Sequence, residues 1–230
     1  MKRYTTLLLD ADDTIFDFGA AEEIAFFAMM EEMGIFADEE MYTAYSRIND
    51  RHWKALERGE MTREQVLFGR YACLAEQFDL QQDPVEMNRC YLENLSRQTI
   101  LFDDSLEAMR ALSRDRRIYI VTNGNAMVQH GRFSKSPIMQ FVDGYFISGE
   151  IGYEKPDIRY FESVFARIPD FDPEYTLLAG DSATSDIKGA IRAGLDSCYV
   201  NRREKPLPTG IVPTYSVKDL AELARLLCEK

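Results

Sequence analysis

The chain has 230 residues, enough for one domain or for a domain with an insertion, and its 46% hydrophobic and 29% charged residues are ordinary for a soluble globular protein. A formal net charge of -12 argues against broad contact with a nucleic acid polymer, although a small phosphorylated substrate needs only a local positive site. The four cysteines form no Cys-x-x-Cys pair and no apolar run reaches transmembrane length, so we expect reduced thiols in a cytoplasmic protein without membrane contact.

The chain opens with a short predicted strand at Leu7 to Leu9, which runs directly into Asp10-Ala11-Asp12-Asp13-Thr14. Three carboxylates within four positions are unfavourable unless positive charge lies among them. A polar turn after a core strand is the simplest interpretation, because Asp is an ordinary turn residue. Alternate side chains of a strand share a face, so Asp10 and Asp12 also qualify as a functional pair.

The segment that follows is predicted to be almost entirely helical. Apolar residues at helical spacing, with their caps and stops, predict helices over residues 19–33, 38–57, from 62 onward and 83–97. Thr62 and Gln65 have the form of a capping box, in which each side chain bonds the other residue's backbone N–H.

From Leu101 onward, short apolar runs alternate with helical segments. The predicted strands cover residues 118–121, 145–148, 175–179 and 197–200, and the predicted helices cover 104–113, 126 onward, 157–168, 184–194 and a last one capped by Ser216. This alternation is typical of βαβ units and a parallel sheet. We therefore predict an α/β fold with a Rossmann-like parallel-sheet core over residues 1–16 and 99–230, and a helical cap domain inserted at residues 17–98.

Polar side chains that could act in catalysis or ligand binding follow four of the predicted strands. They are Asp10 and Asp12, Thr122 and Asn123, Lys155 in a Glu-Lys-Pro loop, and Asp181 with Asp186. Each of these residues could instead have no role in catalysis or binding and serve only as a turn residue or a solvated charge. In open parallel sheets, however, ligands bind beyond the carboxyl ends of the strands, so residues distant in sequence are expected to converge there.

These motifs resemble, in order, the four signatures of the haloacid dehalogenase superfamily. Asp10-Ala11-Asp12-Asp13-Thr14 is similar to its Asp-x-Asp-x-Thr motif, Thr122 to the second, Lys155-Pro156 to the third, and the run from Gly180-Asp181 to Asp186 to the fourth. The helical insertion is similar to the cap that covers small-molecule substrates in this superfamily. The resemblance spans the whole chain.

The resemblance implies a role for each motif residue. Asp10 is the nucleophile that forms an aspartyl-phosphate, and Asp12 is the acid/base that serves the leaving alcohol and then water. Lys155 supplies a fixed cation, while the Thr122 hydroxyl and the Asn123 backbone amide bind phosphoryl oxygens.

The implied cofactor is Mg²⁺, which takes oxygen ligands and neutralises the charge that would repel a carboxylate from a phosphate. Its expected ligands are the carboxylates of Asp10 and Asp181 and the backbone carbonyl of Asp12. Asp186 either binds the ion, directly or through water, or orients the site.

The presence of Asp12 distinguishes the subclasses, because dehalogenases of this superfamily lack an Asp two residues after the nucleophile. We therefore predict hydrolysis of a phosphate monoester. A closer resemblance to bacterial pyrimidine 5′-nucleotidases rests on the residues around motif one, on Thr122-Asn123-Gly124 and on the stretch from Ile147 to Pro156. It implies a nucleoside monophosphate as substrate.

Three residues are the candidate substrate contacts of the cap and the turn beneath it: Phe16, Asn49 and Trp53. Most aromatic residues at helical spacing belong to a core, but an exposed aromatic plane can stack on a nucleobase. The alternatives are a sugar-phosphate phosphatase or phosphomutase of the same superfamily, and, from another class, a non-catalytic binding module. The sequence is compatible with a monomer or a homodimer.

Overall fold

The computed structural model describes residues 3–228; residues 1–2 and 229–230 lie outside the described part. The chain divides into two compact units, one formed by the chain up to Phe18 and from Thr99 onward, the other by Gly19–Gln98. The predicted insertion, residues 17–98, begins two residues earlier than the second unit and ends at the same residue. No helix within residues 3–228 has the length and apolar composition that crossing a membrane requires.

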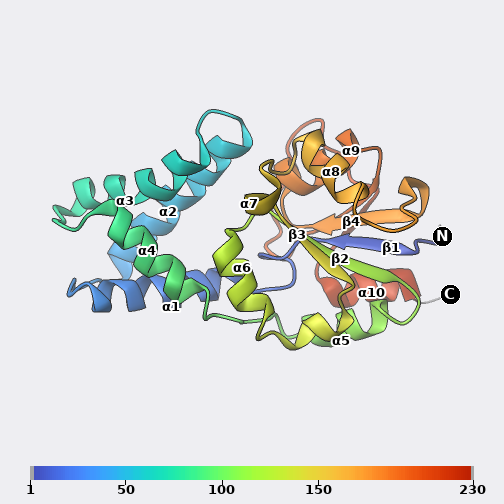
Figure 1. The fold of residues 1–230 in the computed structure, drawn as a ribbon, viewed down its shortest axis with the longest axis horizontal. Helices are drawn as coiled ribbons and strands as arrows, with labels where there is room; N and C mark the ends of the chain where they lie inside the picture. Colours follow the sequence, from blue (N-terminus) through green and yellow to red (C-terminus); the bar gives the residue numbers. More distant parts are fainter. Residues whose placement is uncertain (1–2, 229–230) are drawn as a thin grey trace. The chain divides into compact units, whose positions relative to one another are not determined.

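The first unit is built on a six-stranded sheet in which every neighbouring pair is parallel, as the sequence predicts. Its strands are β1 (Thr6–Leu9), β2 (Arg117–Thr122), β3 (Gly144–Ile147), β4 (Thr176–Gly180), β5 (Asp196–Val200) and β6 (Tyr215–Val217). The spatial order is β3-β2-β1-β4-β5-β6 (Figure 1). Strand β1 is therefore internal, and the chain passes from one side of it to the other between β3 and β4.

Helices cover both faces of the sheet (Figure 1). They are α5 (Ser105–Leu112), α6 (Ala126–Phe133), α7 (Ser148–Ile151), α8 (Ile158–Phe165), α9 (Lys188–Arg192) and α10 (Leu220–Cys228). Because successive strand residues face opposite sides, Leu7 and Leu9 pack in one apolar cluster with α5 and α10, whereas Leu8 packs in a second cluster with α8 and α9. The sheet is thus buried on both faces, which explains its almost continuously apolar strands.

The end of the chain differs from the prediction. Ser216, predicted to cap the last helix, lies within β6, which pairs with β5. Helix α10 begins at Leu220, and the Asp219 carboxylate caps it by accepting a hydrogen bond from Glu222 N at 2.7 Å. The prediction was wrong because a three-residue strand carries too little periodicity to be recognised, while Ser is a frequent helix cap.

The second unit holds the four helices predicted for the insertion. They are α1, which begins in the first unit (Phe18–Glu32), α2 (Glu39–Glu57), α3 (Arg63–Phe78) and α4 (Pro84–Leu95). The predicted capping box of Thr62 and Gln65 is present at the start of α3. Aromatic rings fill the interior: Tyr45 stacks on Phe26 at 4.8 Å between ring centroids and on Tyr71 at 5.6 Å.

The two chain segments that enter and leave the insertion are paired with each other inside the first unit. Asp17 N donates to Ile100 O at 3.0 Å, and Phe16 forms an antiparallel bridge with Leu101. The insertion therefore begins and ends at neighbouring points of the first unit.

Candidate functional site

The register of the central strands brings three of the predicted motifs to one edge of the sheet. Leu9 pairs with Ile120 of β2 and with Ala179 of β4. Asp10, Thr122 and Asp181 consequently leave their strands within one or two residues of the same level. This edge is the carboxyl end of the strands, where open parallel sheets bind ligands.

Lys155 is the charged centre of this edge. Its ammonium is buried and donates three hydrogen bonds, to Asp10 Oδ1 at 2.6 Å, to Asp186 Oδ1 at 2.6 Å and to the Val121 carbonyl at 2.8 Å. Burial alone would lower the pKa of Lys155, but the charges of Asp10 and Asp186 outweigh it and raise that pKa above its ordinary value. Lys155 is therefore a permanent cation that joins two motifs.

Asp186 is held by the backbone that follows β4. Residues Ala183–Ile187 form a π-helical turn, and Asp186 Oδ2 accepts a hydrogen bond from Ser182 N at 3.0 Å. A Cβ placed on Gly180 would lie 2.2 Å from Asp186 Oδ2, so only glycine at this position permits the approach. The π-helical turn and Gly180 together accommodate this carboxylate beside the end of β4.

Three carboxylates form a candidate metal centre. One oxygen each from Asp10, Asp181 and Asp186 lies within 4.8 Å of the others, and Asp10 and Asp186 are buried. Burial, and then the charge of Asp186, raises the pKa of Asp181 to about 7. Burial also raises the pKa of Asp10 well above its ordinary value, against the opposing charge of Lys155. The negative charge of these three carboxylates exceeds the positive charge of Lys155. A set of ligands made only of oxygen atoms fits a hard divalent cation.

Asp12 lies in a separate network with two residues of α6. Gln129 Nε2 donates to Asp12 Oδ2 at 2.8 Å, and the buried Arg132 guanidinium donates to Asp12 Oδ1. Gln129 Nε2 also donates to Thr122 Oγ1 at 3.0 Å. The predicted acid/base and the predicted phosphate ligand are therefore joined through one amide.

The side chain of Asn123 is occupied by the Lys155 loop. Its Oδ1 accepts from Lys155 N at 2.8 Å and its Nδ2 donates to Lys155 O at 2.8 Å. Asn123 thus fixes the position of the Lys155 backbone. Asp13 adopts φ +58°, which is a turn conformation, and pairs with Arg203 at 3.0 Å.

The structure does not favour two of the three candidate substrate contacts. Phe16 is fully buried in the core beneath Arg132. Asn49 is 4% exposed, and it donates to Glu22 at 2.6 Å and accepts from Arg70 at 2.7 Å, so its polar atoms serve the interior of the helical unit. Trp53 is partly exposed, with the Arg63 guanidinium 5.6 Å from its ring centroid.

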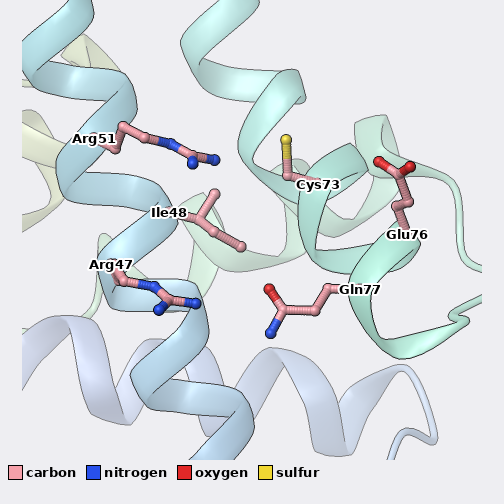
Figure 2. A pocket seen from close by; sticks show the side chains of 6 residues that line it. All are labelled: Arg47, Ile48, Arg51, Cys73, Glu76 and Gln77. Carbon is pink, nitrogen blue, oxygen red and sulfur yellow. The ribbon is translucent and has the colours of Figure 1, made fainter.

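A hollow of about 290 Å³ lies between α2 and α3 in the helical unit. It is lined by Arg47, Ile48, Arg51, Cys73, Glu76 and Gln77 (Figure 2). None of these residues belongs to the four motifs, so this hollow does not carry the motif chemistry.

Gln129 and Arg132 were not predicted from the sequence. Their spacing of three residues places them on one face of α6, immediately after the second motif, and this is the only signal that pointed to them. Polar residues at helical spacing are usually solvated, and only the structure shows that both are fully buried.

Comparisons with known proteins agree with this arrangement. A family model described as haloacid dehalogenase-like hydrolase matches residues 4–194. YfnB of Bacillus subtilis, named as a HAD-hydrolase, is 40% identical over 227 residues, covering 99% of this chain and 97% of YfnB. Its magnesium-bound crystal structure superposes with a TM-score of 0.95 over 98% of this chain and 99% of that one, at 39% identity.

Two further relatives have a stated activity. The pyrimidine 5′-nucleotidase PynA of Streptococcus pneumoniae is 32% identical, covering 96% of this chain and 93% of PynA. The pyrimidine 5′-nucleotidase YjjG of Escherichia coli is 28% identical, covering 99% of both chains.

Proposed function

This chain belongs to the haloacid dehalogenase-like hydrolases and is a phosphatase, and we propose that it is a Mg²⁺-dependent pyrimidine 5′-nucleotidase. Its similarity along almost the whole chain to two pyrimidine 5′-nucleotidases is the observation that carries this proposal. Because the similarity extends through residues 19–98, it includes the helical unit as well as the catalytic motifs.

The proposed reaction begins with attack by the Asp10 carboxylate on phosphorus. A bond forms between Asp10 and phosphorus, and the bond from phosphorus to the nucleoside oxygen breaks with its electron pair on that oxygen. Asp12 gives that oxygen a proton. In the second half, Asp12 takes a proton from water as the water oxygen displaces Asp10 from phosphorus.

Other residues of the edge bind and orient the phosphoryl group. Lys155, fixed by Asp10, Asp186 and the Val121 carbonyl, contributes a buried positive charge next to the nucleophile. The Thr122 hydroxyl and the Asn123 backbone amide are the proposed donors to phosphoryl oxygens. Fixed charges and donors of this kind supply most of what phosphoryl transfer needs from a protein.

Mg²⁺ is the proposed cofactor, with Asp10 and Asp181 as carboxylate ligands and the Asp12 carbonyl as a third. Asp186 is proposed to bind the ion directly or through water while it anchors Lys155. The bound ion would neutralise phosphoryl charge. The excess of carboxylates and the raised pKa of Asp181 support a cation at this place.

The substrate is proposed to be a nucleoside monophosphate, with Trp53 as the remaining cap residue suited to stack on a base. We further propose a cytoplasmic enzyme that acts as a monomer or homodimer on a free metabolite. All four cysteines lie within the described residues and are free thiols, which is compatible with a reducing compartment.

A phosphatase screen tests the proposal. Purified protein with Mg²⁺ is expected to release phosphate from dUMP, dTMP and UMP faster than from hexose phosphates, and Asp10→Asn is expected to lower turnover at least about 1,000-fold because it removes the nucleophile. Asp13→Asn is the matched control, since Asn tolerates the same positive φ.

Each departure from this result has a separate meaning. Faster hydrolysis of hexose phosphates than of nucleotides would show that the protein is a sugar-phosphate phosphatase and not a nucleotidase. Activity that survives both EDTA and Asp10→Asn would refute the mechanism.

A further inference from the structure

Two residues of α6, Gln129 and Arg132, form a closed network with the proposed acid/base. We propose that they are positioning residues, which hold Asp12 and Thr122 in the orientations that phosphate transfer requires. This inference rests on the proposed function, specifically on Asp12 as acid/base and on Thr122 as a phosphate ligand.

Arg132 is the anchor of the network. It is fully buried, and its guanidinium carbon lies 4.4 Å from the centroid of the Phe16 ring. One terminal nitrogen donates both to Asp12 Oδ1 and to Gln129 Oε1, the latter at 3.2 Å. A buried guanidinium is costly unless a carboxylate pairs with it, so Arg132 and Asp12 fix each other's position.

Gln129 has only one possible amide orientation. Its Oε1 accepts from Arg132, so Nε2 faces Asp12 Oδ2 at 2.8 Å and Thr122 Oγ1 at 3.0 Å. Separate donors therefore hold the two oxygens of Asp12, and rotation of its carboxylate would break one bond or the other. An acid/base that must serve two steps at one phosphorus atom gains from such a fixed position.

Gln129 also determines whether the Thr122 hydroxyl donates or accepts its remaining hydrogen bond. Thr122 Oγ1 accepts from Gly124 N at 3.1 Å and from Gln129 Nε2, which occupies both of its acceptor positions. Its O–H hydrogen remains, and no residue within 3–228 accepts it. Thr122 is thereby left as a donor at the edge of the sheet, which is the role that a phosphoryl oxygen requires.

Gly124 makes room for this arrangement. A Cβ at Gly124 would lie 2.3 Å from Gln129 Nε2 and 2.6 Å from its Cγ. The glycine after Thr122-Asn123 thus serves the packing of Gln129 against the motif, in addition to its place in the turn.

The simpler alternative is that the network only stabilises α6 against the sheet. The leaving group separates the two interpretations. p-Nitrophenolate departs from phosphorus without a proton, whereas a nucleoside alkoxide needs one from Asp12. A residue that positions Asp12 therefore affects a nucleotide more than p-nitrophenyl phosphate, and a merely structural residue affects both equally.

The experiment measures kcat/KM on p-nitrophenyl phosphate and on the nucleoside monophosphate that the screen finds best. Arg132→Met is expected to lower kcat/KM for the nucleotide at least about 30-fold and for p-nitrophenyl phosphate less than about threefold. Arg132→Lys should recover part of the loss. His130→Ala is the control on α6, because His130 is exposed and pairs with Glu150 at 2.7 Å.

Gln129→Leu has a different expected signature, because it also releases Thr122. It should lower kcat/KM for both substrates about tenfold or more, with a larger loss for the nucleotide. Melting temperatures are measured for every variant, and if Arg132→Met does not fold, Gln129→Leu and Arg132→Lys decide. Equal losses on both substrates, losses no greater than in His130→Ala, or faster nucleotide hydrolysis would overturn the positioning role.

Asp12→Ala separates this inference from the proposed function. If Asp12→Ala lowers kcat/KM equally for both substrates, the assignment of Asp12 as the acid fails. If Asp12→Ala is selective and Arg132→Met behaves like His130→Ala, only the positioning role fails.

Discussion

At the scale of single residues, one buried ammonium balances a group of carboxylates. Lys155 has no solvent to replace a lost partner, and its three donors are all used. Asp10 and Asp186 depend on it for the same reason. The chemistry of the site and the stability of the sheet edge are therefore properties of the same ion pairs.

Lys155→Met is expected to destabilise the protein by about 3–5 kcal/mol, because it leaves two buried carboxylates without their cation. The same variant should lose phosphatase activity. Urea unfolding gives the free energy, with Lys205→Met as the control. Lys205 is half exposed and lies 3.7 Å from Asp181, so its removal should cost less than about 1 kcal/mol. Equal costs for the two variants would contradict the central role of Lys155.

The raised pKa of Asp181 determines how this residue makes the stability of the metal-free protein depend on pH. Its pKa of about 7 lies above the ordinary value, so between about pH 4 and pH 7 the folded chain binds a proton that the unfolded chain lacks. This group's contribution to stability therefore falls as pH rises through that window. Because Asp181 is a proposed Mg²⁺ ligand, the ion would compete with the same proton, and the rise in melting temperature on adding Mg²⁺ should be larger at pH 8 than at pH 5.5. An equal rise at both pH values, or no dependence on Asp181→Asn, would contradict this linkage.

The motif residues could be proposed from the sequence because each motif is a short continuous pattern, in which a predicted strand is followed by carboxylates, a hydroxyl or a lysine. Gln129 and Arg132 could not, because nothing local shows that a helix face is buried against a carboxylate 117 and 120 residues away. Asn49 misled for the same reason. The sequence offered Asn49 as a candidate substrate contact, and only its partners show that its polar atoms serve the interior of the helical unit.

At the scale of elements, the π-helical turn after β4 positions a motif carboxylate. The sequence predicted a regular helix from residue 184, whereas the structure has a π turn over Ala183–Ile187 before α9. The register of hydrogen bonds within a turn depends on the Asp186 and Ser182 contacts, which periodicity does not encode. The parallel sheet and the long helices were predictable because strongly periodic segments are long enough to be recognised.

Gly180→Ala tests this element. The added Cβ would lie 2.2 Å from Asp186 Oδ2, so Asp186 must move and Lys155 loses one partner. We expect kcat to fall at least about tenfold, together with a lower melting temperature. Gly149→Ala is the matched control, because a Cβ there meets its nearest atom at 3.5 Å, an ordinary contact. A Gly180→Ala enzyme as active as Gly149→Ala would show that the close approach is dispensable.

At the scale of the whole molecule, the two units have separate interiors. The apolar clusters on both faces of the sheet contain only residues of the first unit, and the stacked aromatic rings around Tyr45 belong only to the second. The change from helices alone to alternating strands and helices near residue 100 is the observation from which we predict an inserted helical domain at residues 17–98. The sequence could not predict the function of the helical unit's interior, because aromatic residues at helical spacing fit both a core and a binding surface.

A variant in which a short Gly/Ser linker replaces residues 19–98 is expected to fold, because neither apolar cluster of the sheet includes a residue of that segment. It should hydrolyse p-nitrophenyl phosphate within about tenfold of the parent rate while losing its preference among nucleotides. Circular dichroism and the substrate screen measure both properties. A folded variant that keeps its nucleotide preference would show that selectivity lies in the sheet unit.

The pairing of Asp17 with Ile100 has a consequence for how such a protein changes over generations. The points of entry and exit are hydrogen-bonded neighbours, and the entropic cost of closing the inserted stretch between them grows only slowly with its length, by about 0.6 kcal/mol for each doubling. Recombination at these two points can exchange the helical segment without disturbing the catalytic sheet. One hydrolytic centre can in this way acquire new substrates by replacement of a single contiguous stretch of gene.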